Sequence, residues 1–513
     1  MAKERIIVLD FGGQYNQLIA RRVRDLHVYS EVLPCTTPIK DLKDPSILGF
    51  IFTGGPNSCY LKKSPTVDPK IFDLGKPILG ICYGAQLMAH LLGGKVEEGT
   101  KKEFGRIEVS INAPSQLFHN VPSETEVFMS HLDQVTVLPK GFKNTASSDL
   151  TPNCAFENTR AKLYAVQFHP EVEHTEYGQK MLENFVRKIC GAKPTWKDEA
   201  FLEEKIAEIK KQVGRHKVIC GLSGGVDSVV TATLLDKAIG SNLYCVFVDH
   251  GLLRKGEADA VEALFNDKEK FKLNFIRVDA SKTFLKRLKD VTDPEKKRKI
   301  IGKTFIDVFK AEKEKLPKCD YLAQGTIYAD RIESGMGLSA KIKSHHNVGG
   351  LPEDIGFKGI VEPLRDLFKD EVRAIGKLLG LPDSIVHRQP FPGPGLAVRI
   401  VGDITPEKIK IVQEADAIFR EELEKAKLKV KLSQYFAALS NMRSVGVKGD
   451  LRSYDYAIVL RAVETDDFMT AKAVELPYKL LAKVSDRIVN EVDGVNRVFY
   501  DYTSKPPATI ELE

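Results

Sequence analysis

A strand-to-helix elbow around one cysteine constrains the fold of this chain more than any other feature. Residues 76–79 have the apolar pattern of a buried strand, residues 85–92 have helical periodicity, and Gly80-Ile81-Cys82-Tyr83-Gly84 lies between them. Glycines on both sides permit a tight turn that holds Cys82 out from the end of the strand. The start of a helix just after Cys82 favours the thiolate. Free cysteines are often merely buried, so the elbow alone leaves a structural cysteine as the alternative.

A second segment, residues 164–171, supplies the partners that a cysteine nucleophile needs. It reads as a strand that runs into a loop and contains His169 and Glu171. Residues two apart on an extended chain share a face, so the imidazole can point toward a nucleophile while the carboxylate holds its far nitrogen. Thr53-Gly54-Gly55-Pro56 ends another strand, and its amides can face an oxyanion. Together these segments favour a catalytic triad over a core histidine and a solvated acid.

The three segments, in this order over roughly the first 190 residues, resemble a class I glutamine amidotransferase. The resemblance implies that Cys82 attacks the side-chain amide of glutamine, that His169 moves the proton and that Glu171 orients His169. The other implied site residues are the oxyanion amides of Gly55 and Tyr83 and the glutamine-binding Gln86. Leu132, after Ser130-His131, stands where that family usually has a glycine.

Composition indicates a large soluble protein. At 513 residues the chain is long enough for two to four domains, and 43% hydrophobic and 28% charged residues are typical of globular proteins. No apolar run approaches the roughly 20 residues of a membrane span, and no signal peptide fits the first residues. The eight cysteines form no Cys-x-x-Cys pair, and the net charge of +6 is small for this length. We therefore expect a cytoplasmic protein that binds neither membranes nor nucleic acid.

A glycine loop follows a second predicted strand, after a boundary near Cys190 and a charged helical connector over 197–212. The strand covers 217–222, Ser223-Gly224-Gly225-Val226-Asp227-Ser228 comes next, and a helix is predicted over 229–238. Exposed amides and a helix N-terminus make such a loop an anion site. The spacing of a Walker A loop is absent. A generic Gly-Gly turn is the alternative, but the two serines and Asp227 favour phosphate binding with a metal.

This loop resembles the pyrophosphate loop of the N-type ATP pyrophosphatases. Segments 247–254, 343–352, 388–396 and 505–511 resemble the glutamine-hydrolysing GMP synthases, and that resemblance covers essentially the whole chain. It implies a carbon-nitrogen ligase of purine biosynthesis that takes ammonia from glutamine and, with ATP and Mg²⁺, aminates xanthosine 5′-monophosphate (XMP) to GMP through an adenyl-XMP intermediate. The implied ATP-binding residues are Ser223, Gly224, Gly225, Val226, Asp227, Ser228 and Val229, with Asp227 as the magnesium ligand. Another glutamine-dependent ATP pyrophosphatase and a non-catalytic sensor are the alternatives.

Further cations and polar residues are candidates for the nucleotide site. The XMP-binding candidates are Arg298, Gln389, Lys505 and Glu511, although Arg298 can equally lie on a solvated helix face. Lys343, His345 and His346 lie in a glycine-flanked segment that reads as a lid, and adjacent histidines on an extended chain point apart, which disfavours a shared metal. Lys369 is a candidate pyrophosphate contact, with an ordinary helix-start charge as its alternative.

The predicted fold class is α/β. We expect a flavodoxin-like amidotransferase domain over 1–190 and an adenine-nucleotide α-hydrolase-like ATP pyrophosphatase domain over 191–390, each built on a parallel sheet. From about residue 391 the pattern changes to an α+β module, with helices over 406–427 and 477–492 and strands over 454–462 and 495–502. The resemblance implies that this third domain, 391–513, dimerises the enzyme and contributes to the nucleotide site.

Overall fold

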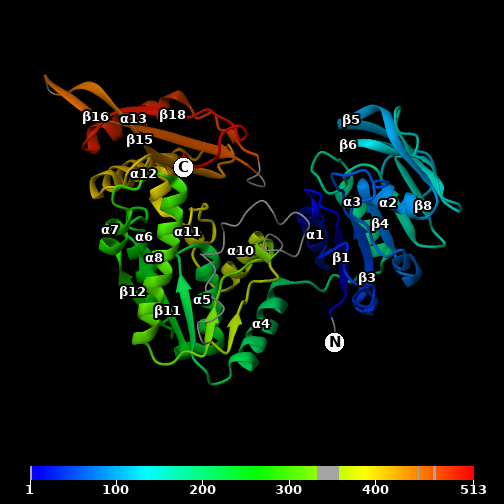
Figure 1. Cartoon of the computed structure of the whole chain (residues 1–513), viewed down its shortest axis with the longest axis horizontal. Coiled ribbons are helices and arrows are strands. Elements are labelled where there is room, and N and C mark those ends of the chain that lie inside the picture. Colours follow the sequence, from blue (N-terminus) through cyan, green and yellow to red (C-terminus); the bar gives the residue numbers. More distant parts are fainter. Residues whose placement is uncertain (1–2, 332–356, 449, 466–469) are drawn as a thin grey trace. The chain divides into compact units, whose positions relative to one another are not determined.

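The computed structural model describes residues 3–331, 357–448, 450–465 and 470–513. These residues form two compact units (Figure 1). The first runs to Phe201 and includes Tyr328–Arg331, and the second comprises the described residues of 202–327 and those from 357 onward. Among the described residues, no helix is both long and apolar enough to cross a membrane.

The first unit is built on a nine-stranded sheet of order β2-β1-β3-β4-β9-β8-β7-β5-β6. Its parallel half consists of β1 (Arg5–Asp10), β2 (Tyr29–Pro34), β3 (Ile47–Phe52), β4 (Ile78–Ile81) and β9 (Leu163–Val166). Its antiparallel half consists of β5 (Lys95–Ile111), β6 (Glu124–Val137), β7 (Lys143–Ser147) and β8 (Ala155–Asn158). The helices are α1 (Asn16–Arg24), α2 (Tyr83–Leu91), α3 (Gly178–Glu183) and a π-helical turn over Asn184–Ile189. The inner parallel strands are continuous apolar runs because both faces of this half are covered.

The second unit contains a five-stranded parallel sheet of order β12-β11-β10-β13-β14. Its strands are β10 (Val218–Leu222), β11 (Leu243–Asp249), β12 (Asn274–Asp279), β13 (Tyr321–Ala323) and β14 (Gly359–Val361). The helices of this region are α4 (Asp198–Val213), α5 (Val226–Ile239), α6 (Glu257–Asn266), α7 (Ser281–Leu288), α8 (Pro294–Lys315), α9 (Tyr328–Arg331), α10 (Lys369–Leu378) and α11 (Asp383–Val386). Of these, α9 belongs to the first unit.

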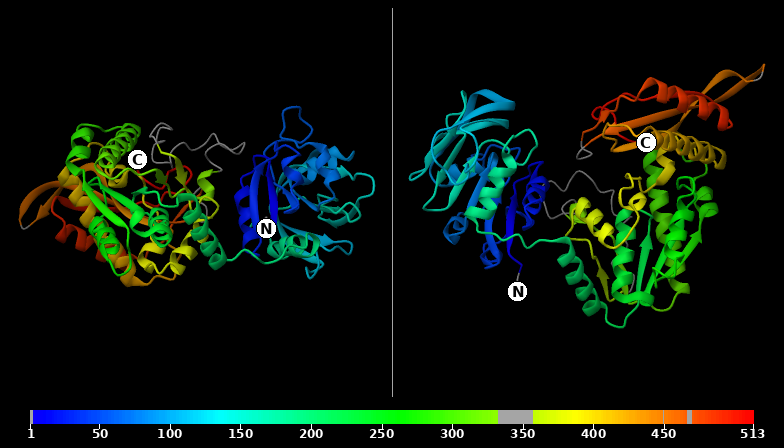
Figure 2. Two further views of the ribbon diagram at one scale, coloured as in Figure 1. Left: turned by 90° about the horizontal axis from the view of Figure 1, so that it is seen from below. Right: turned by 180° about the vertical axis from the view of Figure 1, so that it is seen from behind.

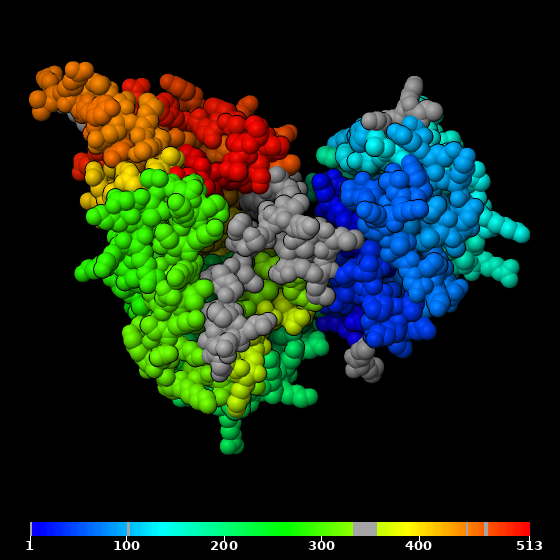
Figure 3. All heavy atoms as spheres, in the orientation of Figure 1, coloured from blue at the N-terminus to red at the C-terminus, as the bar shows by residue number. Residues whose placement is uncertain are grey.

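A four-stranded sheet completes the second unit. It contains β15 (Gln434–Lys448), β16 (Leu451–Glu464), β17 (Lys472–Ala473) and β18 (Val495–Tyr500), with α12 (Pro406–Ala426) and α13 (Tyr478–Glu491) beside it. A 3-10 turn over Gly395–Arg399 precedes α12. One hydrophobic core runs from β11 and α8 through α12 to β15, β16 and α13, so the two sheets of this unit share an interior. The far end of the β15–β16 hairpin extends away from the rest of the unit (Figures 2 and 3).

The α/β fold class is confirmed, and the elements predicted after residue 391 are present. Several boundaries differ from the prediction by up to three residues, and the difference that matters for the site is that α5 begins at Val226 rather than Val229. Its first turn therefore includes Asp227 and Ser228, which places the acidic side chain at the positive end of the helix dipole.

Candidate active site

The predicted elbow lies between β4 and α2. Cys82 has φ +49° and ψ −107°, a strained conformation for a residue other than glycine, and α2 begins at the next residue. A Cβ added to Gly84 would lie 2.5 Å from the Cβ of Phe52, and one added to Gly80 would lie 2.7 Å from the carbonyl oxygen of Gly84. Only glycine fits at both positions, which is why the sequence can hold Cys82 in this geometry.

His169 and Glu171 meet beside this elbow. Nδ1 of His169 lies 2.8 Å from Oε1 of Glu171, and Glu171 is completely buried. Burial by itself lowers the pKa of His169, but Glu171 and Cys82 together raise that pKa well above its usual value. The imidazole therefore holds a proton next to the sulfur. A Cβ on Gly54 would lie 3.1 Å from Cε1 of His169 and 3.9 Å from Cβ of Cys82, so the glycine pair faces both side chains.

The residues predicted for the oxyanion and for glutamine lie in the same place. A Cβ on Gly55 would come within 3.1 Å of Cγ of Tyr83, so these two residues are adjacent. Gln86 is buried on α2, and its Nε2 donates to the carbonyl of Asp133 at 2.7 Å and to Oε1 of Gln167 at 3.2 Å. Its amide group is thus held by other protein groups.

The glycine loop of the second unit lies between β10 and α5. Oγ of Ser223 and Oγ of Ser228 are 3.2 Å apart, and Oγ of Ser228 donates to the carbonyl of Gly225 at 2.9 Å. Lys369, the first residue of α10, forms a 2.5 Å ion pair with Oδ2 of Asp227. The structure therefore brings together both predicted serines, the predicted metal ligand and the predicted pyrophosphate contact.

The residues around Asp227 fit a magnesium ion that is held mainly by a substrate. Oδ1 of Asp227 is buried and has no hydrogen-bond partner. In the part of the chain that the structure describes, no cluster of three or more histidine, cysteine or acidic residues could hold a metal. Mg²⁺ commonly uses one or two carboxylates together with substrate phosphates, and Asp227 can supply one such carboxylate.

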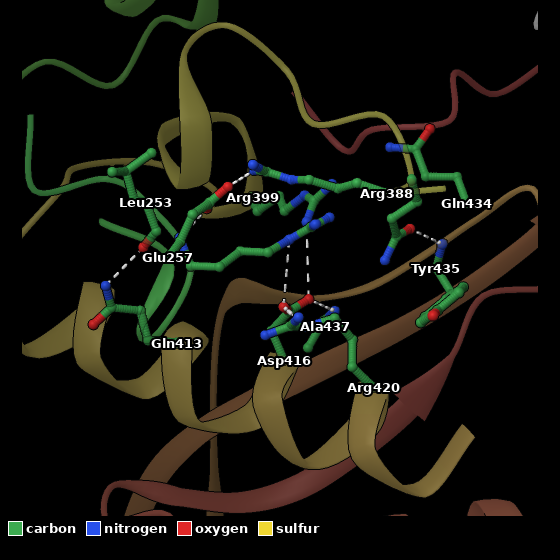
Figure 4. A network of polar contacts seen from close by, with 12 residues as sticks. Leu253, Glu257, Arg388, Arg399, Gln413, Asp416, Arg420, Gln434, Tyr435 and Ala437 are labelled. Atoms are coloured by element: carbon green, nitrogen blue, oxygen red, sulfur yellow. Dashed lines mark hydrogen bonds and ion pairs between the residues drawn. The ribbon is translucent and has the colours of Figure 1, made fainter. Parts of the chain in front are cut away.

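An arginine network extends from this loop to α12 (Figure 4). Arg388 donates to the carbonyl of Gly224 and pairs with Glu257, while Arg254 and Arg420 lie 3.7 and 2.9 Å from Oδ2 of Asp416. Burial lowers the pKa of Arg254 and of Arg388 to about 10. Sequence reasoning missed this network, because Asp416 lies on an ordinary amphipathic helix without a motif.

The predicted XMP residues gather near the C-terminal tail. Glu511 accepts two hydrogen bonds of 2.9 Å from Arg399 and one of 2.6 Å from Gln434. Oε1 of Gln389 accepts from the amide of Tyr435 at 2.8 Å. The other tail contacts involve Lys505, which pairs through its backbone with Ala471, and Arg298, which donates to the carbonyl of Glu513 at 2.7 Å. Lys343, His345 and His346 lie outside the described residues.

The tail also holds a buried lysine of α8. Lys297 is fully buried, donates to the carbonyl oxygens of Ala397 at 3.2 Å and of Ile400 at 2.8 Å, and forms an ion pair with Glu513. The other carboxylate oxygen of Glu513 accepts from the amide of Gly402 at 2.9 Å. The tail is therefore fastened to several elements of the second unit by charged groups.

Three family models match consecutive parts of the chain. Glutamine amidotransferase class-I matches residues 7–189, NAD synthase matches 197–298 and the GMP synthase C terminal domain matches 421–512. A GMP synthase [glutamine-hydrolyzing] of Clostridium botulinum is 58% identical over 513 residues, 100% of both chains. The chain belongs to the glutamine-hydrolysing GMP synthase family. A GMP synthase [glutamine-hydrolyzing] of Treponema denticola is 57% identical over 510 residues, 99% of this chain and 97% of the other.

The solved structure of a putative GMP synthase protein from Thermoplasma acidophilum is 36% identical and covers 37% of this chain and 96% of its own, with a TM-score of 0.35. The position at which this chain departs from the amidotransferase pattern, Leu132, is 44% exposed. The neighbouring His131 is buried and lies 3.2 Å from Glu103.

Proposed function

We propose that this chain aminates XMP to GMP, using glutamine as the ammonia donor and cleaving ATP to AMP and pyrophosphate. The observation that carries this proposal is the presence, in one chain, of the Cys82–His169–Glu171 arrangement and of the Ser223–Ser228 loop with Lys369 at Asp227. The first can release ammonia from an amide, and the second can bind the polyphosphate of a nucleotide.

Glutamine hydrolysis uses the first unit. The Cys82 thiolate attacks the side-chain amide carbon, and the oxyanion that forms is stabilised by the backbone amides of Gly55 and Tyr83. His169 gives its proton to the departing nitrogen, which leaves as ammonia, and a thioester remains on Cys82. His169 then takes a proton from water, whose oxygen displaces the sulfur and releases glutamate. Glu171 keeps the imidazole oriented and stabilises its charged form throughout.

Activation of XMP uses the second unit. The 223–229 loop and Lys369 bind the pyrophosphate portion of ATP while the C2 oxygen of XMP attacks the α-phosphorus. Mg²⁺ bound near Asp227 would offset the phosphate charge. The product is an AMP ester at C2, from which ammonia displaces AMP. Ammonium has no lone pair for this step, so the ammonia must stay unprotonated on its way.

The remaining site assignments belong to the same proposal. Glu511, Gln389, Arg298 and Lys505 bind XMP, and Lys343, His345 and His346, which lie outside the described residues, contact the nucleotides. The division into domains 1–190, 191–390 and 391–513 is proposed with them. The eight free cysteines support a reducing, cytoplasmic location.

The same proposal includes a homodimer that forms through the β15–β16 hairpin. Val445 pairs with Tyr454 across the hairpin and lies on the same face as Val447. Val445 is 48% exposed, Tyr454 is 60% exposed and Val447 is 76% exposed. A second copy of the chain would cover these three apolar residues. Sedimentation equilibrium should show a dimer for the wild type and a monomer for Val447→Asp. Val137→Asp, at a 54% exposed valine of the first unit, is the control.

A chromatographic assay for GMP tests the proposed activity directly. The enzyme is incubated with ATP, Mg²⁺ and XMP, together with either glutamine or an ammonium salt, and we expect GMP and AMP in both reactions. Formation of a different aminated product with another acceptor would indicate another glutamine-dependent ATP pyrophosphatase. Binding of glutamine and nucleotides without any turnover would indicate a sensor.

A further inference from the structure

Gln167 lies against the sulfur of Cys82 and has no role in the mechanism above. It directly follows β9, and the amide of Cys82 donates to the carbonyl of Val166 at 2.8 Å, which places residues 82 and 167 side by side. Gln167 is 1% exposed, and its Nε2 lies 3.7 Å from Sγ of Cys82. It lies two residues before His169, in the bend that follows β9.

The hydrogen-bond network determines which end of the Gln167 amide faces the sulfur. The carbonyl of Asp133 can only accept, so the group of Gln86 that contacts it at 2.7 Å is the amide nitrogen. That nitrogen also donates, at 3.2 Å, to the side-chain oxygen of Gln167. The oxygen of Gln167 is therefore engaged, and its NH₂ group is the end that faces Cys82.

The Cys82 sulfur has a second polar neighbour, which favours the protonated thiol rather than the thiolate. The thiol of Cys82 donates to the carbonyl of Ser130 at 3.8 Å, a contact that only the protonated sulfur can make. The NH₂ group of Gln167 can only donate, so it favours the thiolate. We propose that Gln167 is a catalytic residue of the glutaminase site, which holds the Cys82 sulfur as a thiolate by a hydrogen bond independent of His169. This inference rests on the proposed glutamine hydrolysis.

Such a contact accelerates two steps. A hydrogen bond that stabilises the thiolate increases the fraction of Cys82 that is ionised. The same bond makes each thiolate less nucleophilic, but this loss is only about half as steep as the gain in ionised fraction. The rate of attack on glutamine therefore rises. In the second step water adds to the thioester, His169 takes its proton, and the carbon–sulfur bond breaks with its electron pair on sulfur. The neutral thioester sulfur is a weak acceptor, so the donor interacts most strongly with the sulfur as it leaves.

Two substitutions separate electrostatic action from packing. Gln167→Glu keeps the shape and can still accept from Gln86, but it turns a carboxylate oxygen toward the sulfur, while Gln167→Met keeps the volume without a donor. Gln116→Glu, at an exposed glutamine, is the matched control. Alkylation of Cys82 by iodoacetamide near neutral pH, followed by peptide mass spectrometry, reports on the thiolate without any glutamine. Glutaminase kcat and KM and ammonia-dependent GMP synthesis are measured in parallel.

We expect alkylation of Cys82 and glutaminase kcat to fall about tenfold in Gln167→Met and further in Gln167→Glu, with KM for glutamine within about twofold of wild type. Ammonia-dependent synthesis should be unchanged. Wild-type alkylation in both variants, or a loss confined to KM, would overturn the proposal. If Gln167→Glu does not fold, Gln167→Met decides. A wild-type enzyme that alkylates normally but releases no glutamate would refute the proposed function rather than this inference.

Discussion

Cys82 is the residue whose substitution should separate the two half-reactions. Cys82→Ala removes the nucleophile, so glutamine-dependent GMP formation should fall by at least about 10³-fold. Synthesis from an ammonium salt should persist, because the glycine loop and Asp227 belong to the other unit. Both nitrogen sources are compared by chromatography of GMP. Cys59→Ala, at another buried free cysteine of the first unit, should leave both activities intact. Glutamate release by Cys82→Ala would contradict the assignment.

A site residue could be predicted from the sequence only where its neighbours in the chain form a recognisable motif. Cys82, His169 and Asp227 stand in short motifs whose local geometry already implies a position. The structure places Cys82 at the predicted elbow, His169 in the loop after β9, and Asp227 in the first turn of α5, directly after the glycine loop. Asp416 carries no such signal, since its pairing with Arg420, four residues along α12, is ordinary for a helix and another partner, Arg254, lies far away in the chain. Gln167 lies in the predicted 164–171 segment, but its contact with Cys82 depends on the bend after β9, which the apolar pattern of the strand does not indicate.

At the scale of an element, the first turn of α5 should control ATP use. Asp227→Asn removes the charge that pairs with Lys369 and the carboxylate available to Mg²⁺. GMP synthesis should fall about 10²- to 10³-fold with glutamine and with ammonium alike, because adenylation precedes the use of ammonia. Asp259→Asn, which removes an exposed carboxylate of α6, is the control. Normal ammonia-dependent synthesis by Asp227→Asn would place the ATP site elsewhere.

The turn after β11 should make the second unit sensitive to acid. His250 is buried, its Nδ1 accepts from the amide of Leu252 at 3.0 Å, and burial lowers its pKa to about 4. The unfolded chain takes up a proton on His250 near pH 6.5, whereas the folded chain does not. The contribution of the neutral His250 to the free energy of unfolding is therefore complete above that pH and is lost as the pH falls toward 4. Between about pH 7.5 and pH 5.5 the loss from His250 is about 1.3 kcal/mol.

Urea unfolding at these two pH values measures the effect. His250→Asn keeps an acceptor for the amide of Leu252 but cannot titrate, so its stability should depend on pH by about 1.3 kcal/mol less than that of the wild type. An identical dependence in both proteins would show that His250 is charged in the folded state or relaxes on protonation.

Element boundaries were harder to predict than element types. The two helices and two strands predicted after residue 391 follow simple periodic patterns and their types were correct, whereas β15 and the short β17 were not predicted. The early start of α5 was missed because Val226-Asp227-Ser228 reads equally well as loop, and only the completed turn shows that these residues are helical. The shared core of the two sheets in the second unit joins segments remote in sequence, which periodicity does not report.

At the scale of the whole molecule, the two half-reactions should be coupled. The nucleophile and the glycine loop belong to different units, and ammonia released before XMP is activated would be protonated and lost. We therefore expect glutamate release from glutamine to be about tenfold slower without ATP and XMP than with both. The measurement is a glutamate assay under the two conditions, with the Cys82→Ala protein as the blank. Equal rates would contradict coupling and leave both half-reactions intact.

The ion pair between Lys297 and Glu513 affects how the protein folds while it is made on the ribosome. Lys297 of α8, which is fully buried, and its partner Glu513 are 216 residues apart. At about 5–20 residues per second, translation leaves this lysine without its counter-charge for about 10–40 s. An ammonium group without a partner is costly to bury, so α8 cannot settle into its final place while that part of the chain is still being translated. The triad, by contrast, spans fewer than 100 residues of the first unit, and so all its members have been synthesised long before residue 513.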